Sequence, residues 1–191
     1  MGREVEWKYR CPEAQFDTIR EAFSGWQTIT METAYFDTPD GALEKRRWML
    51  RRRLENGRAV TTVKIPLPDG SRGEWETGCS WDDAIEELCN LGAPLELKQM
   101  AQRGFGEVCA ARFVRLAALV SLPGCSVELA LDRGSFLGSG AEQPFSELEV
   151  ELKDGDEEKA REFAQSLAET YNLEPEEKGK AQRAMALRKT T

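Results

Sequence analysis

Three charged residues near the N-terminus, Glu4, Glu6 and Lys8, are spaced two apart. If this segment is a strand, their side chains share one face, because side chains alternate along a strand. Such a face is either a solvent-exposed surface or the wall of a polar cavity. Carboxylates bind hard divalent cations and an ammonium binds phosphate, so as a cavity wall this stretch would suit a polyanion with its metal ion.

The same alternation recurs in later segments, where the charged faces carry mostly blocks of one sign. The faces are formed by Glu147, Glu149 and Glu151; by Arg72, Glu74 and Glu76; by Arg51 and Arg53; by Thr62 and Lys64; and by Glu128 and Asp132. Any one of these segments is more simply explained by a sheet with one dry and one solvated face. Together they favour a charged cavity, because like charges held close together destabilise one another unless something neutralises them. A polyphosphate with Mg²⁺ or Mn²⁺ satisfies both signs.

The segments that carry these residues predict an α+β fold in a single domain over residues 1–191. Alternating patterns bounded by turn residues predict eight strands, at 4–9, 26–37, 48–55, 58–65, 72–77, 107–120, 127–132 and 145–153. Helical spacing predicts helices at 12–25, within 80–105, at 154–171 and partly at 178–187, and a Gly/Ser loop is expected at 134–140. Eight strands in antiparallel succession can close into a barrel with helices packed outside.

Composition excludes several classes of function. The chain has 26 Lys plus Arg against 34 Asp plus Glu, and the net charge of −8 argues against a nucleic-acid or anionic-membrane partner. It has no histidine, which excludes histidine-based catalysis and His-ligated zinc. The five cysteines form no Cys-x-x-Cys pair, and no apolar run suits a membrane span or a signal peptide. We therefore expect a cytoplasmic protein, monomeric or homodimeric.

The charged residues also resemble a known family. Glu4-x-Glu6-x-Lys8 matches the ExExK signature of CYTH domains, the triphosphate tunnel metalloenzymes. Further matches follow in family order: Tyr35-Phe36-Asp37-Thr38-Pro39, Leu50-Arg51-Arg52-Arg53, Thr62-Val63-Lys64, Arg72-x-Glu74-x-Glu76, Arg112, Val127 to Asp132, Glu147 to Glu151, and Lys180 to Ala184. The resemblance runs from residue 4 to about residue 187 and is greatest to the bacterial inorganic triphosphatase branch.

The resemblance implies a closed eight-stranded antiparallel tunnel and a role for each charged group. It implies that the small-molecule triphosphate is held by Lys8, Arg51, Arg53, Lys64, Arg112, Lys180 and Arg183. It implies Mg²⁺ or Mn²⁺ ligands at Glu4, Glu6, Glu128, Glu147 and Glu149, with Glu74, Glu76, Asp132 and Glu151 as further candidates. The catalytic set is then Glu4, Glu6, Lys8 and Glu149, with Lys8 on phosphate or on the attacking water. Arg112 is preferred over Arg115, which competes for the same role.

The function expected from this set is metal-dependent hydrolysis of the terminal phosphate of inorganic triphosphate or a related triphosphate. Alternatives are a class IV adenylyl cyclase, a thiamine triphosphatase and a non-catalytic polyphosphate-binding module. A lipocalin-like barrel for apolar ligands is disfavoured, because the glutamates alternate onto one strand face. The sequence leaves open the place of residues 80–105 and of Arg52 and Trp48.

Overall fold

The computed structural model describes residues 5–68 and 72–187, which form an α+β fold. In these ranges the strands are β1 (Glu6–Arg10), β2 (Gln27–Asp37), β3 (Met49–Glu55), β4 (Arg58–Pro66), β5 (Arg72–Thr77), β6 (Gly106–Leu122), β7 (Cys125–Gly138), β8 (Ala141–Gly155) and β9 (Glu174–Pro175). The helices are α1 (Glu13–Ala22), α2 (Ala42–Lys45), α3 (Trp81–Asn90), α4 (Glu96–Ala101), α5 (Glu157–Tyr171) and α6 (Lys180–Ala186). All eight expected strands and the expected helices are present, whereas α2 and β9 were not predicted.

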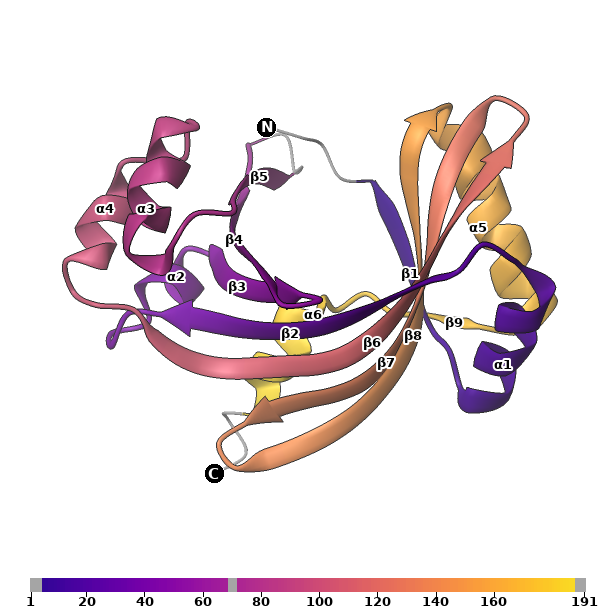
Figure 1. The fold of residues 1–191 in the computed structure, drawn as a ribbon, viewed down its shortest axis with the longest axis horizontal. Helices are drawn as coiled ribbons and strands as arrows, with labels where there is room; N and C mark the ends of the chain where they lie inside the picture. Colours follow the sequence, from indigo (N-terminus) through magenta and orange to yellow (C-terminus); the bar gives the residue numbers. More distant parts are fainter. Residues whose placement is uncertain (1–4, 69–71, 188–191) are drawn as a thin grey trace.

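The strands form one curved antiparallel sheet with free edges (Figure 1). Their order is β5-β4-β3-β2-β6-β7-β8-β1-β9, and within the described residues no pairing joins β5 to β1 or β9. The expected closed eight-stranded barrel is therefore not confirmed. Strand number alone does not close a sheet, because closure also needs a matching tilt and stagger of the strands.

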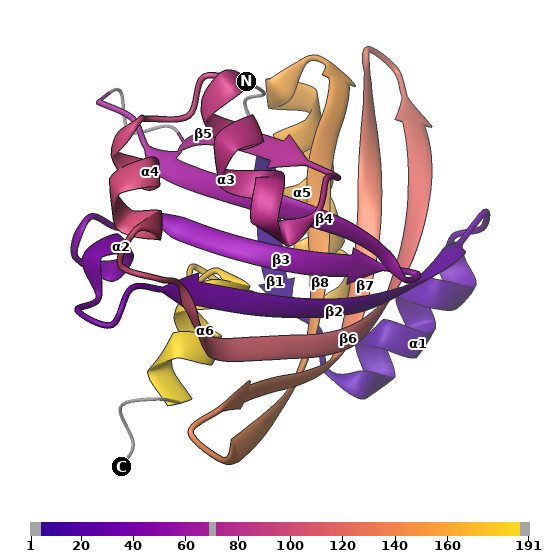
Figure 2. The same cartoon turned by 60° about the vertical axis from the view of Figure 1, so that its left-hand side comes forward.

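Helices cover the convex face of the sheet in two separate groups (Figures 1 and 2). On β1, β7 and β8 the core includes Leu129, Leu148 and Val150, packed against α1 and α5. On β3, β4 and β5 a second cluster packs against α2, α3 and α4, which places residues 80–105 outside the sheet. None of the helices in the described ranges is long and apolar enough to cross a membrane.

The short helix α6 packs on the other, concave face of the sheet. Its Ala184 is fully buried in a cluster with Met31 and Tyr35 of β2 and Phe113 of β6. Apolar side chains therefore lie on the concave face beneath α6, although the charged residues of the neighbouring strands lie on the same face. This helix brings Lys180 and Arg183 into the concave side of the sheet.

The Gly/Ser loop expected at 134–140 is wrong. Strand β7 continues to Gly138, pairs with Ala141 of β8, and only Ser139 and Gly140 form the turn, both with positive φ. Gly134 lies inside this strand. The position requires glycine because the backbone of β6 passes close to it. A Cβ atom at this position would lie 2.1 Å from the carbonyl oxygen of Arg112 and 2.5 Å from the Cα atom of Phe113. Glycine here marks close strand packing and not a loop.

Gly134→Ala is expected to destabilise the fold, because the added methyl group meets backbone atoms that cannot rotate away. Overpacking of this kind lowers the free energy of unfolding by about 1–3 kcal/mol. Urea unfolding followed by circular dichroism measures it. Gly106→Ala on β6 is the matched control, since nothing lies within 4 Å of its added Cβ, and it should change stability by less than about 0.5 kcal/mol. Equal effects of the two substitutions would contradict the close approach.

Candidate functional site

The concave side of the sheet holds a large cavity of about 1720 Å³ with charged walls. One wall, the acidic wall, consists of Glu6 of β1, Glu128 of β7, and Glu149 and Glu151 of β8. The other, the basic wall, consists of Arg51 and Arg53 of β3 and Lys64 of β4, with Glu74 and Glu76 of β5 beside them. Lys8, Arg115 and Lys180 also line the cavity. The alternation read from the sequence thus places these side chains on one face.

Two guanidinium groups of the basic wall each have a buried nitrogen atom without a hydrogen-bond partner among the described residues. These atoms are the Nε atoms of Arg51 and Arg53. Burial lowers the pKa of Arg53, and the neighbouring charge of Arg51 lowers it further. The carboxylate of Glu74 lies 3.6 Å from Arg51 Nη2 and 3.3 Å from Lys64 Nζ, and Arg53 forms a close ion pair with Glu55. Two close guanidiniums with unpaired buried donors suit an anion.

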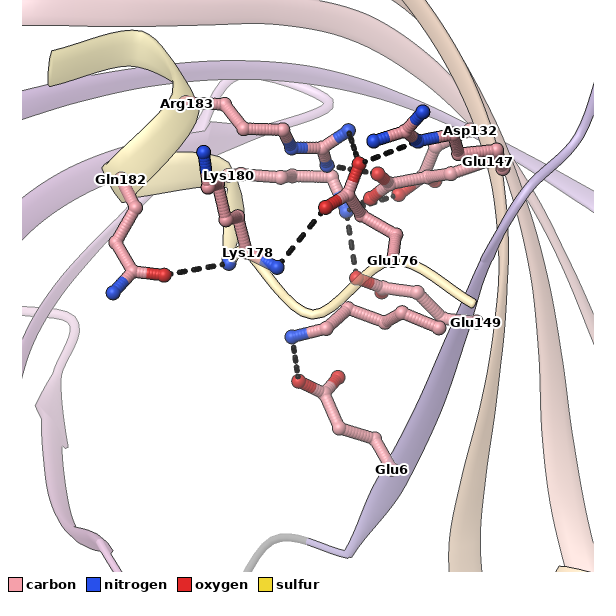
Figure 3. Close-up of polar contacts among 12 residues, drawn as sticks. Glu6, Asp132, Glu147, Glu149, Glu176, Lys178, Lys180, Gln182 and Arg183 are labelled. Atoms are coloured by element: carbon pink, nitrogen blue, oxygen red, sulfur yellow. Dashed lines mark hydrogen bonds and ion pairs between the residues drawn. The ribbon is translucent and has the colours of Figure 1, made fainter. Parts of the chain in front are cut away.

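The acidic wall is organised by cross-strand register. Glu151 of β8 pairs with Glu6 on one side and with Glu128 on the other, so three carboxylates form a row across three adjacent strands. Directly opposite residues on adjacent strands lie close enough for their side chains to interact. In the next row Lys8 pairs with Glu149, and Lys8 Nζ donates to Glu6 Oε1 at 2.8 Å (Figure 3). Glu4 lies outside the described residues.

A dense network of ion pairs lies beneath the acidic wall (Figure 3). Oxygen atoms of Asp132, Glu147 and Glu149 lie within 4.8 Å of one another, close enough for one metal ion to bridge. Lys180 Nζ contacts all three carboxylates, at 2.7 Å from Asp132 Oδ2 and 2.7 Å from Glu149 Oε1, and also touches Glu147. Arg115 binds Asp132 and Glu149. The two cations therefore occupy the region between these carboxylates.

Burial and the charges of this network compete, and they shift the pKa values of Glu147 and Glu149 in opposite directions. Burial alone would raise the pKa of Glu149, but the charges of Lys180 and Arg115 outweigh it and hold that pKa well below its ordinary value. For Glu147, burial dominates and the pKa is raised despite Lys180 and Arg183. Burial opposes the charge on Lys180, yet the three carboxylates hold its pKa above its ordinary value. Glu149 is thus a carboxylate at the cavity surface.

Glu147 and Arg183 were expected to line the cavity and lie below its surface instead. Glu147 has no exposed surface, and Arg183 contacts it from α6 while its Nη1 atom lies 3.7 Å from Glu176 Oε2. Glu176 also accepts a hydrogen bond from Arg10 and was not singled out in the sequence. These residues attach α6 and the segment before it to the sheet.

Arg112 was expected to line the cavity in preference to Arg115, and the structure places the two arginines the other way round. Arg112 is exposed and borders a shallow depression beside Thr30 and Gly134, whereas Arg115 lines the charged cavity. The register of β6 and β7 accounts for this placement, since Arg115 pairs with the buried Asp132 on β7. Arg52, between the two basic-wall arginines, faces outward and lies over the ring of Trp81.

Comparison with known proteins identifies the family. A family model of the CYTH domain matches residues 2–185. The inorganic triphosphatase of Haemophilus influenzae is 28% identical over an alignment of 149 residues. The match covers 74% of this chain and 41% of that protein, so the chain spans less than half of this relative.

Two solved structures share the fold. A candidate adenylyl cyclase from Hippeastrum, with a dominant triphosphatase activity, has a TM-score of 0.69 and 18% identity, covering 97% of this chain and 96% of that chain. A candidate adenylate cyclase from Bacillus halodurans has a TM-score of 0.67 and 23% identity, covering 96% and 98%. Because the family model matches almost the whole sequence, the chain belongs to the CYTH domain family.

Proposed function

We propose that the chain hydrolyses the terminal phosphate of inorganic triphosphate, or of a related triphosphate, with a divalent cation. The observation that carries the proposal is the pairing of two oppositely charged walls in one cavity. The basic wall has buried guanidinium nitrogens without hydrogen-bond partners in the described part of the chain, and the acidic wall has a row of carboxylates. A polyanion and a hard cation would neutralise both walls together. The triphosphatase activity of the Haemophilus influenzae relative agrees with this.

The residues of the acidic wall fit Mg²⁺ or Mn²⁺. They offer only carboxylate oxygens, the ligand that hard cations prefer, and Glu6, Glu128 and Glu151 lie in one cross-strand row. Glu149, two residues before Glu151 on β8, would complete the set together with Glu4. Glu147 fits less well, because it is buried below the cavity surface against Lys180 and Arg183. When bound, the cation supplies charge neutralisation at the phosphate oxygens.

The basic side chains of this chain would bind and orient the triphosphate. Arg51 and Arg53 present guanidinium donors, which match phosphate oxygens in a bidentate way, and Lys64 adds a point charge. Lys8 lies between the carboxylates of Glu6 and Glu149, at 2.8 Å from the former. From there it would contact the terminal phosphate or orient the attacking water. Catalysis of phosphoryl transfer by such a site depends mainly on positioning and electrostatic stabilisation.

Removal of the divalent cation is expected to abolish phosphate release. The purified chain is incubated with inorganic triphosphate, ATP and thiamine triphosphate in turn, with Mg²⁺, Mn²⁺ or a chelator, and free phosphate is measured. We expect release with either cation and at least about a 100-fold lower rate with the chelator, since the metal stabilises transition-state charge by several kcal/mol. Adding the cation back should restore the rate.

The same incubation separates the alternatives. Phosphate release that continues unchanged in the chelator would contradict the metal-dependent mechanism. Formation of cyclic AMP from ATP, measured in the same samples, would favour a cyclase instead. Triphosphate that protects the chain against thermal unfolding without releasing phosphate would indicate a binding module.

A further inference from the structure

Asp132 is fully buried, yet it contacts two cations that line the cavity. Arg115 Nε donates to Asp132 Oδ1 at 2.8 Å, and Arg115 Nη2 donates to Asp132 Oδ2 at 2.7 Å. Lys180 Nζ lies 2.7 Å from the same Oδ2 atom. One carboxylate therefore holds an arginine of β6 and a lysine of α6. Asp132 itself is absent from the cavity lining among the described residues.

The two cations are also shared with a carboxylate that does line the cavity. Arg115 and Lys180 both contact Glu149, which is 12% exposed, whereas Asp132 has no exposed side-chain surface. Each cation thus has a surface partner, which a ligand or metal can reach, and a buried partner, which it cannot. If Glu149 turns toward a metal ion, Asp132 remains as a fixed anchor. Buried bidentate contacts of this kind fix the direction of a guanidinium.

We propose that Asp132 is a positioning residue that keeps Arg115 and Lys180 directed at the bound triphosphate. The proposal rests on the proposed function, because it assigns these two cations to the phosphate side of the reaction. Charge balance supports it: Asp132, Glu147 and Glu149 face Arg115, Lys180 and Arg183. Without Asp132 the two cations lose their shared buried partner and repel each other, and Glu149 is the carboxylate that still contacts both. The cluster of three carboxylates, which resembles a metal site, would then bind cationic side chains of the protein itself.

Asp132→Asn in the full chain tests the proposal. The amide keeps the shape of the carboxylate, but its NH₂ group cannot accept a hydrogen bond and the charge is lost. We expect kcat/KM for inorganic triphosphate to fall about 10- to 100-fold, the usual range for a residue that orients a contact residue, with the larger part in KM. Asp154→Asn, an exposed position on β8, is the control and should leave both constants unchanged. A variant with wild-type constants would overturn the proposal.

A second variant distinguishes loss of positioning from loss of the fold. Asp132→Asn combined with Arg115→Gln removes one charge of each sign, so the buried network stays balanced. If Asp132 acts through Arg115, the loss in kcat/KM of this double variant is smaller than the product of the two single losses. A loss equal to that product shows independent roles and contradicts the proposal.

Acylation of Lys180 gives a readout that does not depend on activity. Its Nζ atom is held in ion pairs inside the network, so a trace of an amine-reactive acetylating reagent should modify it slowly relative to the exposed Lys45. Mass spectrometry should show a severalfold faster modification of Lys180 in Asp132→Asn, and an unchanged ratio would overturn the anchor. If the wild-type chain hydrolyses no triphosphate, the proposed function fails, but this ratio still decides whether Asp132 holds Lys180.

Discussion

Glu149→Gln is expected to reduce phosphate release from inorganic triphosphate by at least about 100-fold, the scale of losing one group that stabilises transition-state charge. Glu149 lines the cavity and lies next to Lys8 in the strand register. Its two carboxylate oxygens accept hydrogen bonds from Lys180 and Arg115. The glutamine amide cannot replace a carboxylate as a ligand for a hard cation. Initial rates at saturating Mg²⁺ or Mn²⁺ and varied substrate measure the loss, which should fall mainly on kcat.

The fold should survive this substitution. Lys180 and Arg115 keep Asp132 as a partner, and the amide oxygen still accepts a hydrogen bond. We expect the free energy of unfolding in urea to fall by about 1–3 kcal/mol, the cost of one weakened buried polar group. Glu142→Gln, at an exposed position of the same strand, is the control for charge loss. A Glu149→Gln chain that cannot fold would show a structural role and would refute the catalytic assignment.

Arg51→Gln combined with Arg53→Gln is expected to lower kcat/KM for inorganic triphosphate by about 10³-fold. Each guanidinium would donate charge-assisted hydrogen bonds to phosphate, and each such contact contributes ~1.5–3 kcal/mol. The loss should appear mainly in KM, because these contacts already form in the bound substrate. Stability should fall by less than about 2 kcal/mol, because a partly exposed ion pair contributes at most about 1 kcal/mol. Arg51 Nη2 lies 3.6 Å from the carboxylate of Glu74, and Arg53 pairs with the partly exposed Glu55.

Arg52→Gln is a matched control on the same strand. Its side chain faces outward, where it lies over Trp81 and its Nη1 atom is 3.4 Å from Thr61 Oγ1. We expect wild-type kcat and KM for this variant. Equal losses of activity for Arg52→Gln and for the double variant would mean that the basic wall is not the phosphate site.

The alternation of charged and apolar residues predicted most of the strands but could not predict how the sheet ends. Antiparallel order follows from short turns between consecutive strands, as at Asn56 and Gly57. Closure depends on whether β5 pairs with β1 or β9 at the opposite edge of the sheet. No local sequence pattern encodes the distance between these two edges. The short strand β9 was missed for a similar reason: its two residues pair with β1 only because α5 returns the chain there.

The sequence also could not predict how deeply each charged side chain of the site is buried. Glu147, Glu149 and Glu151 alternate identically, yet Glu147 is buried because α6, from the end of the chain, covers it with Lys180 and Arg183. The choice of Arg112 on strand β6 was wrong for the same reason. Beneath α6 the concave face of β6 is apolar and its convex face is exposed, so Arg112 points to solvent. The meaning of the alternation therefore changes along one strand.

The separation of the two charged walls gives the cavity a permanent dipole. The basic wall belongs to β3 and β4 and the acidic wall to β1, β7 and β8, and each half of the sheet is supported by its own hydrophobic cluster. The molecule as a whole carries a net charge of −8 and repels a free polyanion at long range. A chelate of triphosphate with a divalent cation carries less charge and has two unlike ends. Such a chelate would be repelled less during diffusional approach and turned by the dipole into one orientation on entry.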